Sequence, residues 1–287
     1  AAVSVAASKF TDKAGNNSTA ASLSGGIAFD TVAPSVSSIT TTGSALKSGA
    51  GSVTTGAKVT FTVNTSEVVT VSGSPWLTLS NGATATFSAG SGSKALTFDY
   101  TVAATDTNVA DLAVQSVGLN GGTILDGAGN GLSALASGGV NPAGALVVDT
   151  VAPDLMITSD KSSLKSGATA KITFDFSEDP LTSFTATDVT VVGGTLTGLT
   201  TTGKTRTATF TPTANTDSMA ASITVAAGSY TDAAGNGGLA GVTPSLTVDT
   251  LAPTLTITSN KSSLKVGEIT TLTFTASEDI IGFEAGD

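Results

Sequence analysis

Histidine and cysteine are absent from this 287-residue chain, and arginine occurs once, as Arg206. The lack of cysteine excludes disulfides and thiol nucleophiles, and the lack of histidine excludes imidazole bases and the usual structural zinc fingers. With 12 basic and 22 acidic residues, the net charge is −10, which argues against nucleic acid or an anionic membrane as a partner. No apolar run approaches the ~20 residues that span a bilayer, so we expect no membrane insertion.

The residues that are abundant favour strands. The chain contains 51 threonines and 33 glycines, and only 12% of its residues are charged. Threonine and valine suit a pleated, half-buried surface, whereas the usual helix-surface residues are scarce. We therefore predict an all-β protein of two or three domains. Because the sequence lacks an initial methionine, we expect it to be an interior part of a larger protein.

Three short motifs recur along the chain in a fixed order. Each occurs three times: Asp-Thr-x-Ala-Pro begins at Asp30, Asp149 and Asp249, Ser-Glu at Ser66, Ser177 and Ser277, and Asp-x-Ala-Gly-Asn at Asp12, Asp126 and Asp232. Successive copies of the first motif are 119 and 100 residues apart. A period near 100 is longer than that of solenoid or propeller repeats and matches one β-sandwich domain.

The order of the motifs defines the domain boundaries. Asp-Thr-x-Ala-Pro opens a unit, Ser-Glu follows, and Asp-x-Ala-Gly-Asn lies near the next opening. We therefore expect complete domains at 31–149 and 150–249. Residues 1–30 are expected to be the last two strands of a truncated domain, and residues 250–287 the first strands of another.

The hydrophobic alternation of 150–249 predicts its strands. Ile172, Phe174 and Phe176 alternate with polar residues, so they should face the core. The same reasoning predicts strands at 155–158, 171–176, 184–192, 196–200, 206–211, 223–225 and 246–248. Seven short strands in about 100 residues are typical of an immunoglobulin-like Greek-key β-sandwich. The chain is thus predicted to be an elongated array of tandem Ig-like domains.

These motifs resemble the bacterial Ig-like repeats of large cell-surface adhesins and biofilm-associated proteins of the RTX-adhesin type. The resemblance rests on Asp-Thr-Val-Ala-Pro at 149–153, Thr-Phe-Asp-Phe-Ser-Glu-Asp-Pro at 173–180 and Asp-Ala-Ala-Gly-Asn at 232–236. The 31–149 domain is similar to a sister repeat, with an insertion around Trp76. The resemblance implies a secreted stalk on the bacterial surface, with calcium bound between domains.

Acidic side chains are expected to gather where one domain follows another. In the seven-strand topology, the turns after the second strand and before the last strand lie at the end where the chain enters the domain. The turn after the fifth strand of the preceding domain faces the same junction. The first junction contains Asp30, Glu67, Asp126 and Asn130. The second contains Asp149, Glu178, Asp179, Asp232 and Asn236, with Asp106 and Asp111 from the preceding domain. The third contains Asp249, Glu278 and Asp279, with Asp217 from the preceding domain.

Clustered carboxylates repel each other unless a cation lies between them. Oxygen ligands on flexible loops suit Ca²⁺ better than Mg²⁺ or zinc, so calcium is the expected cofactor at these junctions. The alternative is that Asp-x-Ala-Gly-Asn is simply a hairpin turn, since Asp and Asn favour turns on their own. Similarly, Trp76 is either a platform for stacking sugars or a packed side chain of the inserted turn.

No enzymatic function is predicted. Glu178 and Asp179 are adjacent on one turn and cannot readily flank a glycosidic bond at the ~5–9.5 Å that hydrolysis requires. The leading hypothesis is a calcium-stiffened structural stalk at the bacterial cell surface, outside the cell. The alternatives are a subunit of a self-assembling filament or sheath, and a module that binds glycans or proteins. The predicted partners are calcium and the neighbouring Ig-like domains, with other copies of the chain or surface glycans as further candidates.

Overall fold

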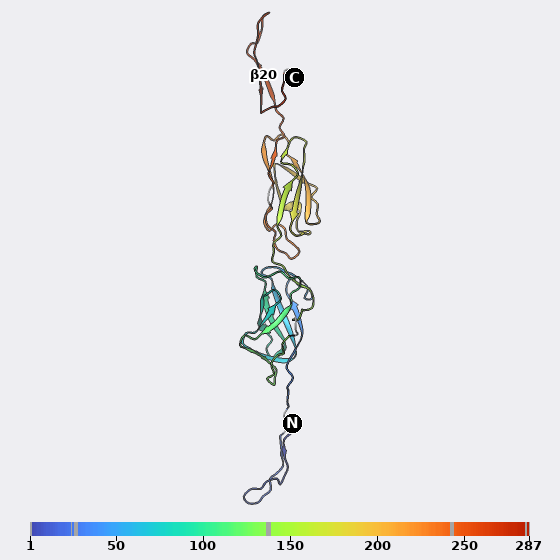
Figure 1. Ribbon diagram of the computed structural model, residues 1–287, viewed down its shortest axis with the longest axis vertical. Coiled ribbons are helices and arrows are strands. Elements are labelled where there is room, and N and C mark those ends of the chain that lie inside the picture. Colours follow the sequence, from blue (N-terminus) through green and yellow to red (C-terminus); the bar gives the residue numbers. More distant parts are fainter. Residues whose placement is uncertain are drawn as a thin grey trace. The chain divides into compact units, whose positions relative to one another are not determined.

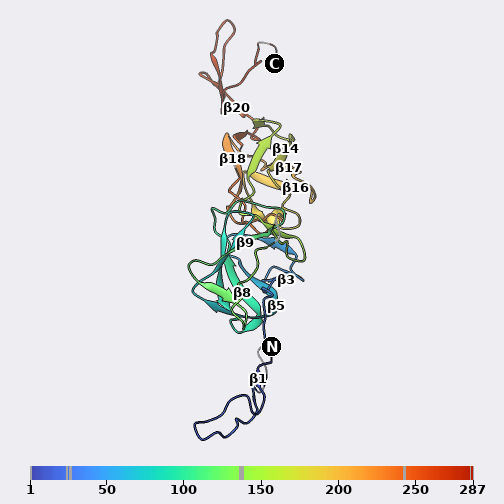
Figure 2. The ribbon, with the colours of Figure 1, turned by 60° about the horizontal axis from the view of Figure 1, so that its bottom comes forward.

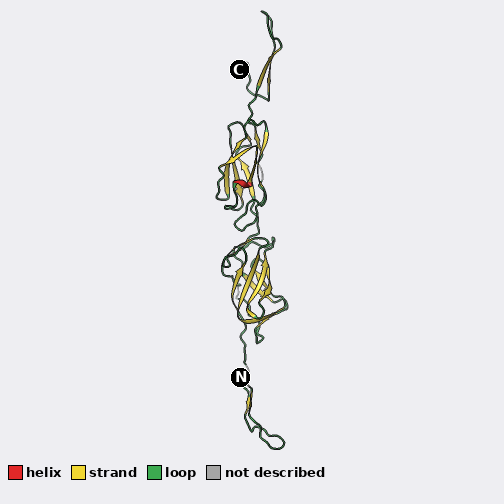
Figure 3. Ribbon diagram, turned by 180° about the vertical axis from the view of Figure 1, so that it is seen from behind, coloured by secondary structure: helices red, strands yellow, loops and turns green. Residues whose placement is uncertain are grey.

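The computed structural model describes residues 2–23, 25, 28–135, 139–241, 244–284 and 286. The chain divides into two compact units, Ala1–Val151 and Ala152–Asp287 (Figure 1). Among the described residues, the only helical segment is a single 3₁₀ turn, η1 (Ala186–Asp188), drawn in red in Figure 3. None of these residues belongs to a helix long and apolar enough to cross a membrane. The all-β prediction is confirmed.

The second unit contains a sandwich of two four-stranded sheets. One sheet has the strand order β12 (Leu155–Ser159), β14 (Ala170–Phe176), β17 (Thr205–Pro212) and β16 (Gly194–Thr197). The other has the order β13 (Ser163–Leu164), β19 (Leu246–Val248), β18 (Met219–Val225) and β15 (Val189–Val192). Figure 2 labels β14, β17, β16 and β18 of this unit. Two mainly antiparallel sheets of this kind form the predicted Ig-like sandwich.

The core of this sandwich follows the predicted alternation. Ile172 and Phe174 are fully buried and Phe176 is 4% exposed, while the residues between them face outward. The prediction of a strand over 184–192 was wrong at its start, because β15 begins at Val189. Asp188 Oδ2 accepts hydrogen bonds from the backbone nitrogen of Thr185, at 2.7 Å, and from its hydroxyl, at 2.9 Å. These local bonds favour the 3₁₀ turn over an extended strand.

The first unit has a different sheet arrangement, with one seven-stranded sheet. Its order is β10 (Thr123–Leu125), β5 (Lys58–Ser72), β8 (Ser93–Thr101), β7 (Thr84–Ala89), β6 (Trp76–Leu79) and β9 (Val114–Gly118), and β3 (Val36–Thr42) also pairs with β5. A separate parallel pair joins β4 (Gly51–Val53) and β11 (Leu146–Val148). Strand β5 has 15 residues and changes register between Asn64 and Val69, so its second half can pair with β10. The expected insertion thus lengthens a strand and adds an edge.

Each unit has one hydrophobic core, and neither core reaches the ends of the chain. In the first unit, Val59, Phe61 and Val63 alternate inward on β5 as predicted, and all are buried. The pairs β1 (Ser4–Val5)/β2 (Ala21–Ser22) and β20 (Leu255–Ser259)/β21 (Leu272–Ala276) are isolated hairpins. Phe274 on β21 is 46% exposed, whereas its counterpart Phe174 is fully buried. Two strands without a facing sheet cannot bury their apolar side chains.

Candidate metal centre

The Asp-x-Ala-Gly-Asn motif is a self-contained hairpin turn. Asp126 Oδ1 accepts from the backbone nitrogens of Ala128, at 2.9 Å, and Asn130, at 2.8 Å, while Asn130 Nδ2 donates to Asp126 Oδ2 at 2.8 Å. Gly129 has φ +96°, a left-handed conformation that costs other residues energy. The copies that begin at Asp12 and Asp232 make the same bonds.

The hairpin-turn interpretation therefore describes all three copies of the motif. The Asp12 copy has this geometry although Asp12 belongs to none of the three-acid groups found among the described residues. The turn also explains the charge state of its aspartate. Burial alone would raise the pKa of Asp126, but hydrogen bonds from the side chain and backbone of Asn130 and from the backbone of Ala128 outweigh burial and lower it. Asp126 is thus an anion at neutral pH.

The serine of each Ser-Glu motif joins the first two strands of its repeat. Ser66 Oγ accepts from the backbone nitrogen of Ser35 at 3.0 Å, and the backbone nitrogen of Ser66 donates to the carbonyl of Ser35 at 2.8 Å. Ser177 makes the same pair of bonds with Asp154, and Ser277 with Thr254. This serine therefore places the glutamate that follows it beside the segment that leads into the repeat.

The Asp-Thr-x-Ala-Pro motif is held by the other two motifs. In the first unit we call its residues 30–34 the lead-in segment. The carbonyl of Pro34 accepts from the backbone nitrogen of Ser133 at 2.8 Å, and Asn130 Nδ2 donates to the carbonyl of Asp30 at 3.2 Å. In the second unit the carbonyl of Pro153 accepts from the backbone nitrogen of Leu239 at 2.9 Å. The lead-in segment is therefore bonded to the Asp-x-Ala-Gly-Asn turn and to the residues that follow that turn.

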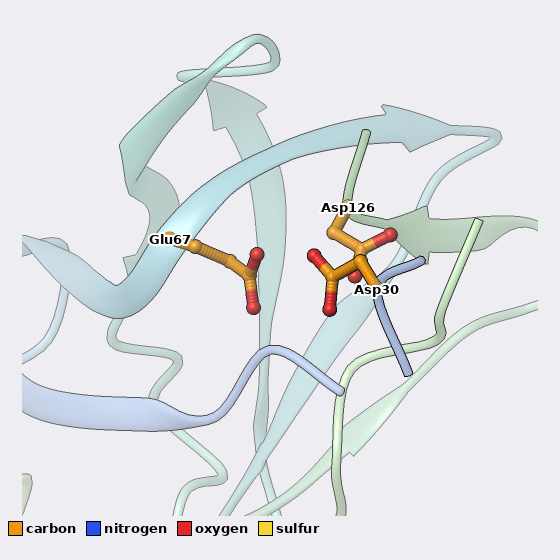
Figure 4. Close-up of side chains that lie close together, drawn as sticks. All are labelled: Asp30, Glu67 and Asp126. Atoms are coloured by element: carbon orange, nitrogen blue, oxygen red, sulfur yellow. The ribbon is translucent and has the colours of Figure 1, made fainter. Parts of the chain in front are cut away.

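This interlocking brings three carboxylates together in the first unit. One carboxylate oxygen from each of Asp30, Glu67 and Asp126 lies within 4.8 Å of the other two (Figure 4). Asp126 is buried, Glu67 is half-buried and Asp30 is exposed. Asp30 is itself oriented, because its Oδ1 accepts from the backbone nitrogen of Val32 at 3.0 Å. We call this group the lead-in acid cluster.

The lead-in acid cluster has the chemistry of a site for a hard cation. Its ligand atoms are carboxylate oxygens on loops and a strand bulge, which suit Ca²⁺. The Nδ2 atoms of Asn130 and Asn236 donate to Asp126 and Asp232, so these amides hold the turns that carry the acids. The amide oxygen is the atom that binds calcium, so both asparagines stay predicted ligands.

The second set of predicted residues is spread over both units. In the second unit, carboxylate oxygens of Glu178 and Asp232 lie within 4.8 Å of each other. In the first unit, Asp149 Oδ1 accepts from Asn108 Nδ2 at 2.6 Å and from the backbone nitrogen of Val151 at 3.1 Å. Asp179, expected beside Glu178 as a ligand, instead forms an ion pair with Arg206 at 3.2 Å.

Several predicted ligands serve the folding of their own domains. Asp106 Oδ2 accepts from the Tyr100 hydroxyl at 2.6 Å and from the backbone of Ala103 at 2.8 Å. Asp111 accepts from the backbone of Leu146 at 3.1 Å and from the side chain of Asn141. These bonds tie Asp106 and Asp111 to neighbouring strands and turns of the first unit, which spacing along the chain could not reveal.

The residues predicted for the third junction form no three-acid group among those the structure describes: Asp217, Asp249, Glu278 and Asp279. Asp249 Oδ1 is buried and makes no hydrogen bond within the described part of the chain.

Trp76 is placed by packing within the first unit. It lies half-buried on β6, and a Cβ built on Gly118 of the adjacent strand β9 would approach Trp76 Nε1 to 2.4 Å. The indole therefore covers a strand position that only glycine can occupy without displacement. This geometry favours the packing interpretation over a platform for sugars.

Sequence reasoning also missed the most buried charge of the molecule. Arg206 is fully buried in the second unit. The sequence did contain a signal for this burial. Arg206 lies two and four residues before Ala208 and Phe210 on β17, so its side chain points to the same inward face of the strand.

Comparison with protein families agrees with the sandwich of the second unit. The model of the bacterial Ig-like domain family matches residues 149–248 and 249–287. No curated protein matches the chain. Among solved structures, the I9–I11 tandem of titin is 15% identical, with 72% of this chain and 64% of that chain covered and a TM-score of 0.33. The Z1Z2 domains of titin in complex with telethonin are 12% identical, with 78% and 100% covered and a TM-score of 0.24.

The family match covers the sandwich of the second unit and the hairpin that follows it. Both segments begin with Asp-Thr-x-Ala-Pro and carry the serine that joins the first two strands of the repeat. Residues 149–287 thus consist of bacterial Ig-like repeats and belong to the bacterial Ig-like domain family.

Proposed function

We propose that this protein is a structural spacer in a bacterial surface protein outside the cell, with Ca²⁺ bound where an Ig-like repeat begins. Bacterial Ig-like domains are structural modules and typically extracellular, which supports the general role. The observation that carries the calcium proposal is the lead-in acid cluster, in which Asp30, Glu67 and Asp126 converge. Each comes from a different repeated motif.

A cation would relieve a specific electrostatic conflict. Asp126 keeps its negative charge because its turn donates hydrogen bonds to it. Two further carboxylates lie within 4.8 Å, so a divalent ion among them replaces repulsion with attraction. Extracellular calcium modules bind with Kd on the order of 10⁻⁴–10⁻³ M. At a tenfold excess of free ion over Kd, binding adds about 1.4 kcal/mol to the free energy of unfolding.

The structural consequence would be a fixed start to the repeat. Asp30 lies on the lead-in segment, while Glu67 lies on β5 and Asp126 in a turn of the same unit. An ion bound to all three carboxylates would connect the lead-in segment both to β5 and to the Asp126 turn. Pro34 already restricts φ there, and it biases Ala33 to an extended conformation. A repeated connection of this kind would keep successive repeats from hinging freely.

The second set of motifs extends the proposal by sequence equivalence. Asp149, Glu178 and Asp232 are the counterparts of Asp30, Glu67 and Asp126. We propose that Glu178 and Asp232, which lie together in the second unit, have the same role at the start of that repeat. Asp179 is left out of this set because Arg206 already holds it.

The decisive experiment replaces Glu67 with glutamine in the full chain. Glu67→Gln keeps the shape of the side chain and spares Asp126, whose loss would break the turn. Thermal unfolding of the first unit can be followed through Trp76, the only tryptophan of the chain. We expect calcium at ten times Kd to raise the midpoint of the unmodified protein by roughly 5 °C. Glu67→Gln should abolish most of that rise.

Glu268→Gln is the matched control, because it removes the same charge from an exposed residue outside the cluster. This variant should respond to calcium like the unmodified protein. Amide hydrogen exchange at residues 31–33 should also slow when calcium is added, but not in Glu67→Gln. Small-angle scattering of the full chain should change when calcium is chelated. An equal calcium response in Glu67→Gln and Glu268→Gln, or none in either, would refute the proposal.

A further inference from the structure

Arg206 lies at the centre of a hydrogen-bond network inside the second unit. It is fully buried on β17, and its guanidinium donates to the carbonyls of Phe184, at 3.0 Å, and Leu181, and to Asp179 Oδ1 at 3.2 Å. Its Nε donates to the carbonyl of Gly203 at 3.2 Å. Three of these four acceptors lie in one loop, residues 177–184, which carries Glu178.

The surroundings of this guanidinium are apolar apart from its acceptors. The rings of Phe176 and Phe184 lie 5.9 and 5.8 Å from its central carbon. A cation buried in this way is tolerated only while its partners are present, because water cannot replace them. Asp179 supplies an opposite charge, and its Oδ1 also accepts from the backbone of Leu181 at 2.9 Å. Arg206 and Asp179 are therefore mutually dependent.

The first unit has different residues at the positions equivalent to Arg206 and Asp179. Lys94 and Lys204 each donate Nζ to the carbonyl of the motif serine, at 2.9 Å to Ser66 and 2.7 Å to Ser177, so these lysines are equivalent. Two residues after each lysine come Leu96 and Arg206, and one residue after each motif glutamate come Val68 and Asp179. The charged pair of one repeat thus corresponds in sequence to two apolar residues in the other, of which Leu96 is buried and Val68 is exposed, while the glutamate is common to both.

The two repeats also hold that glutamate by different means. In the first unit, Thr65 Oγ1 donates to the carbonyl of Glu67 at 2.6 Å, inside the continuous strand β5. In the second unit the equivalent strand ends at Phe176, and the 177–184 loop follows. Two carbonyls of that loop, those of Leu181 and Phe184, accept from Arg206.

The loop in turn contacts Thr231, the residue that precedes Asp232. The carbonyls of Leu181 and Phe184, both bound by Arg206, lie on either side of Ser183. Ser183 Oγ donates to the carbonyl of Thr231 at 2.7 Å and accepts from its backbone nitrogen at 3.0 Å. Thr231 directly precedes Asp232, so a series of bonds runs from Arg206 to the positions of both Glu178 and Asp232.

We propose that Arg206 is a positioning residue for the proposed cation site, acting with Asp179 as a coupled structural pair. Together they fix the 177–184 loop against Thr231, the residue before Asp232, and withdraw Asp179 from cation binding. The claim that Arg206 positions the cation site rests on the proposed function. The claim that Arg206 and Asp179 depend on each other does not.

A double-mutant cycle in the full chain tests the pair without calcium. Asp179→Val, Arg206→Leu and the double variant are compared with the unmodified protein in a chelator, by amide hydrogen exchange on β14 and β17. Each single variant should speed exchange by about a hundredfold or more, because it leaves a buried charge or loses the loop. The double variant should exchange no faster than Arg206→Leu alone, because Asp179 has no buried cation to neutralise once the guanidinium is gone. A double variant whose exchange is faster by the product of the two single effects would overturn the pairing.

Calorimetric titration with calcium distinguishes a positioning role of Arg206 from a purely structural one. All variants are made in the Glu67→Gln protein, so that the remaining calorimetric signal comes from the second set of motifs. Asp179→Asn keeps the hydrogen-bond acceptor and should leave calcium affinity within about twofold, whereas Glu178→Gln should abolish binding. Arg206→Lys, which lacks the fork that spans several carbonyls, should weaken calcium binding about tenfold or more while the domain stays folded. An equal loss in Asp179→Asn and Glu178→Gln would make Asp179 a ligand and overturn the assignment. If the background protein binds no calcium, the proposed function fails for this site, and the double-mutant cycle still decides the pair.

Discussion

Two glycines of one turn should respond in opposite ways to the same substitution. Gly127 and Gly129 both belong to the Asp126 turn, and an added Cβ would meet no atom within 4 Å at either position. They differ in backbone conformation, because Gly129 has φ +96° and Gly127 has no such left-handed φ. The other copies of the motif agree, with Lys13 and Ala233 in the place of Gly127 but glycine in the place of Gly129.

The size of the effect follows from that difference. An L-residue forced into the left-handed region loses about 1–2 kcal/mol, so Gly129→Ala should lower the free energy of unfolding by that amount. Gly127→Ala restricts only the unfolded chain and should raise the same quantity by about 0.4–1 kcal/mol. The two variants should therefore differ by about 1.5–3 kcal/mol. For an m-value near 2 kcal/mol per molar urea, their midpoints should lie about 1 M apart.

Urea unfolding followed by Trp76 fluorescence measures this, with calcium chelated. The single tryptophan lies on β6, so the signal reports the first unit. Gly235→Ala makes the equivalent change in the second unit and serves as the control, because it should leave the Trp76 transition where it is. If Gly127→Ala and Gly129→Ala shift the midpoint equally, backbone conformation is not the reason for the glycine, and our account of the turn is wrong.

Three further predictions concern the first unit. Ser66→Ala removes the acceptor of a strand-joining hydrogen bond and should cost about 0.5–1 kcal/mol in urea unfolding, and an unchanged midpoint would show that this bond does not stabilise the fold. The lowered pKa of Asp126 means that its contribution to stability is complete above its ordinary pKa of 3.8 and disappears as the pH falls through the lower folded value. Acid unfolding of Asp126→Asn should lack that part of the pH dependence, and an identical pH profile would contradict it. Gly118→Ala places a Cβ 2.4 Å from Trp76 Nε1, so it should shift the tryptophan emission and cost about 1–3 kcal/mol, whereas an unchanged spectrum would refute the packing of the indole.

The strands and the core were largely predictable from the sequence. Alternation reports burial directly in a strand, because successive side chains point to opposite faces. This is why Ile172 and Phe174 were assigned correctly to the core of the second unit. The prediction failed at 184–188, where Thr185 and Asp188 bond to each other and form a turn. Period-2 alternation does not account for such local side-chain bonds.

The candidate site was only partly predictable. The repeat spacing indicated that Asp30, Glu67 and Asp126 would meet, and the structure places them within 4.8 Å of one another. The spacing could not show that Asp179 faces Arg206 or that Asp106 faces Tyr100. A carboxylate looks the same in a sequence whether it is available to a cation or already bonded within its domain.

The sequence by itself determined the repeat length, the all-β class, the inward faces of the strands and the turns that require glycine. All of these depend on residues close together in the chain, where backbone geometry and hydrophobic period act directly. Only the tertiary structure decided the sheet order of the first unit and the partners of the buried charges. Those depend on which segments meet across the domain, as when the 15-residue strand β5 pairs with β10, or Arg206 reaches the 177–184 loop. The physical reason is that partners distant in the chain are chosen by packing and desolvation, which act only once the fold brings them together.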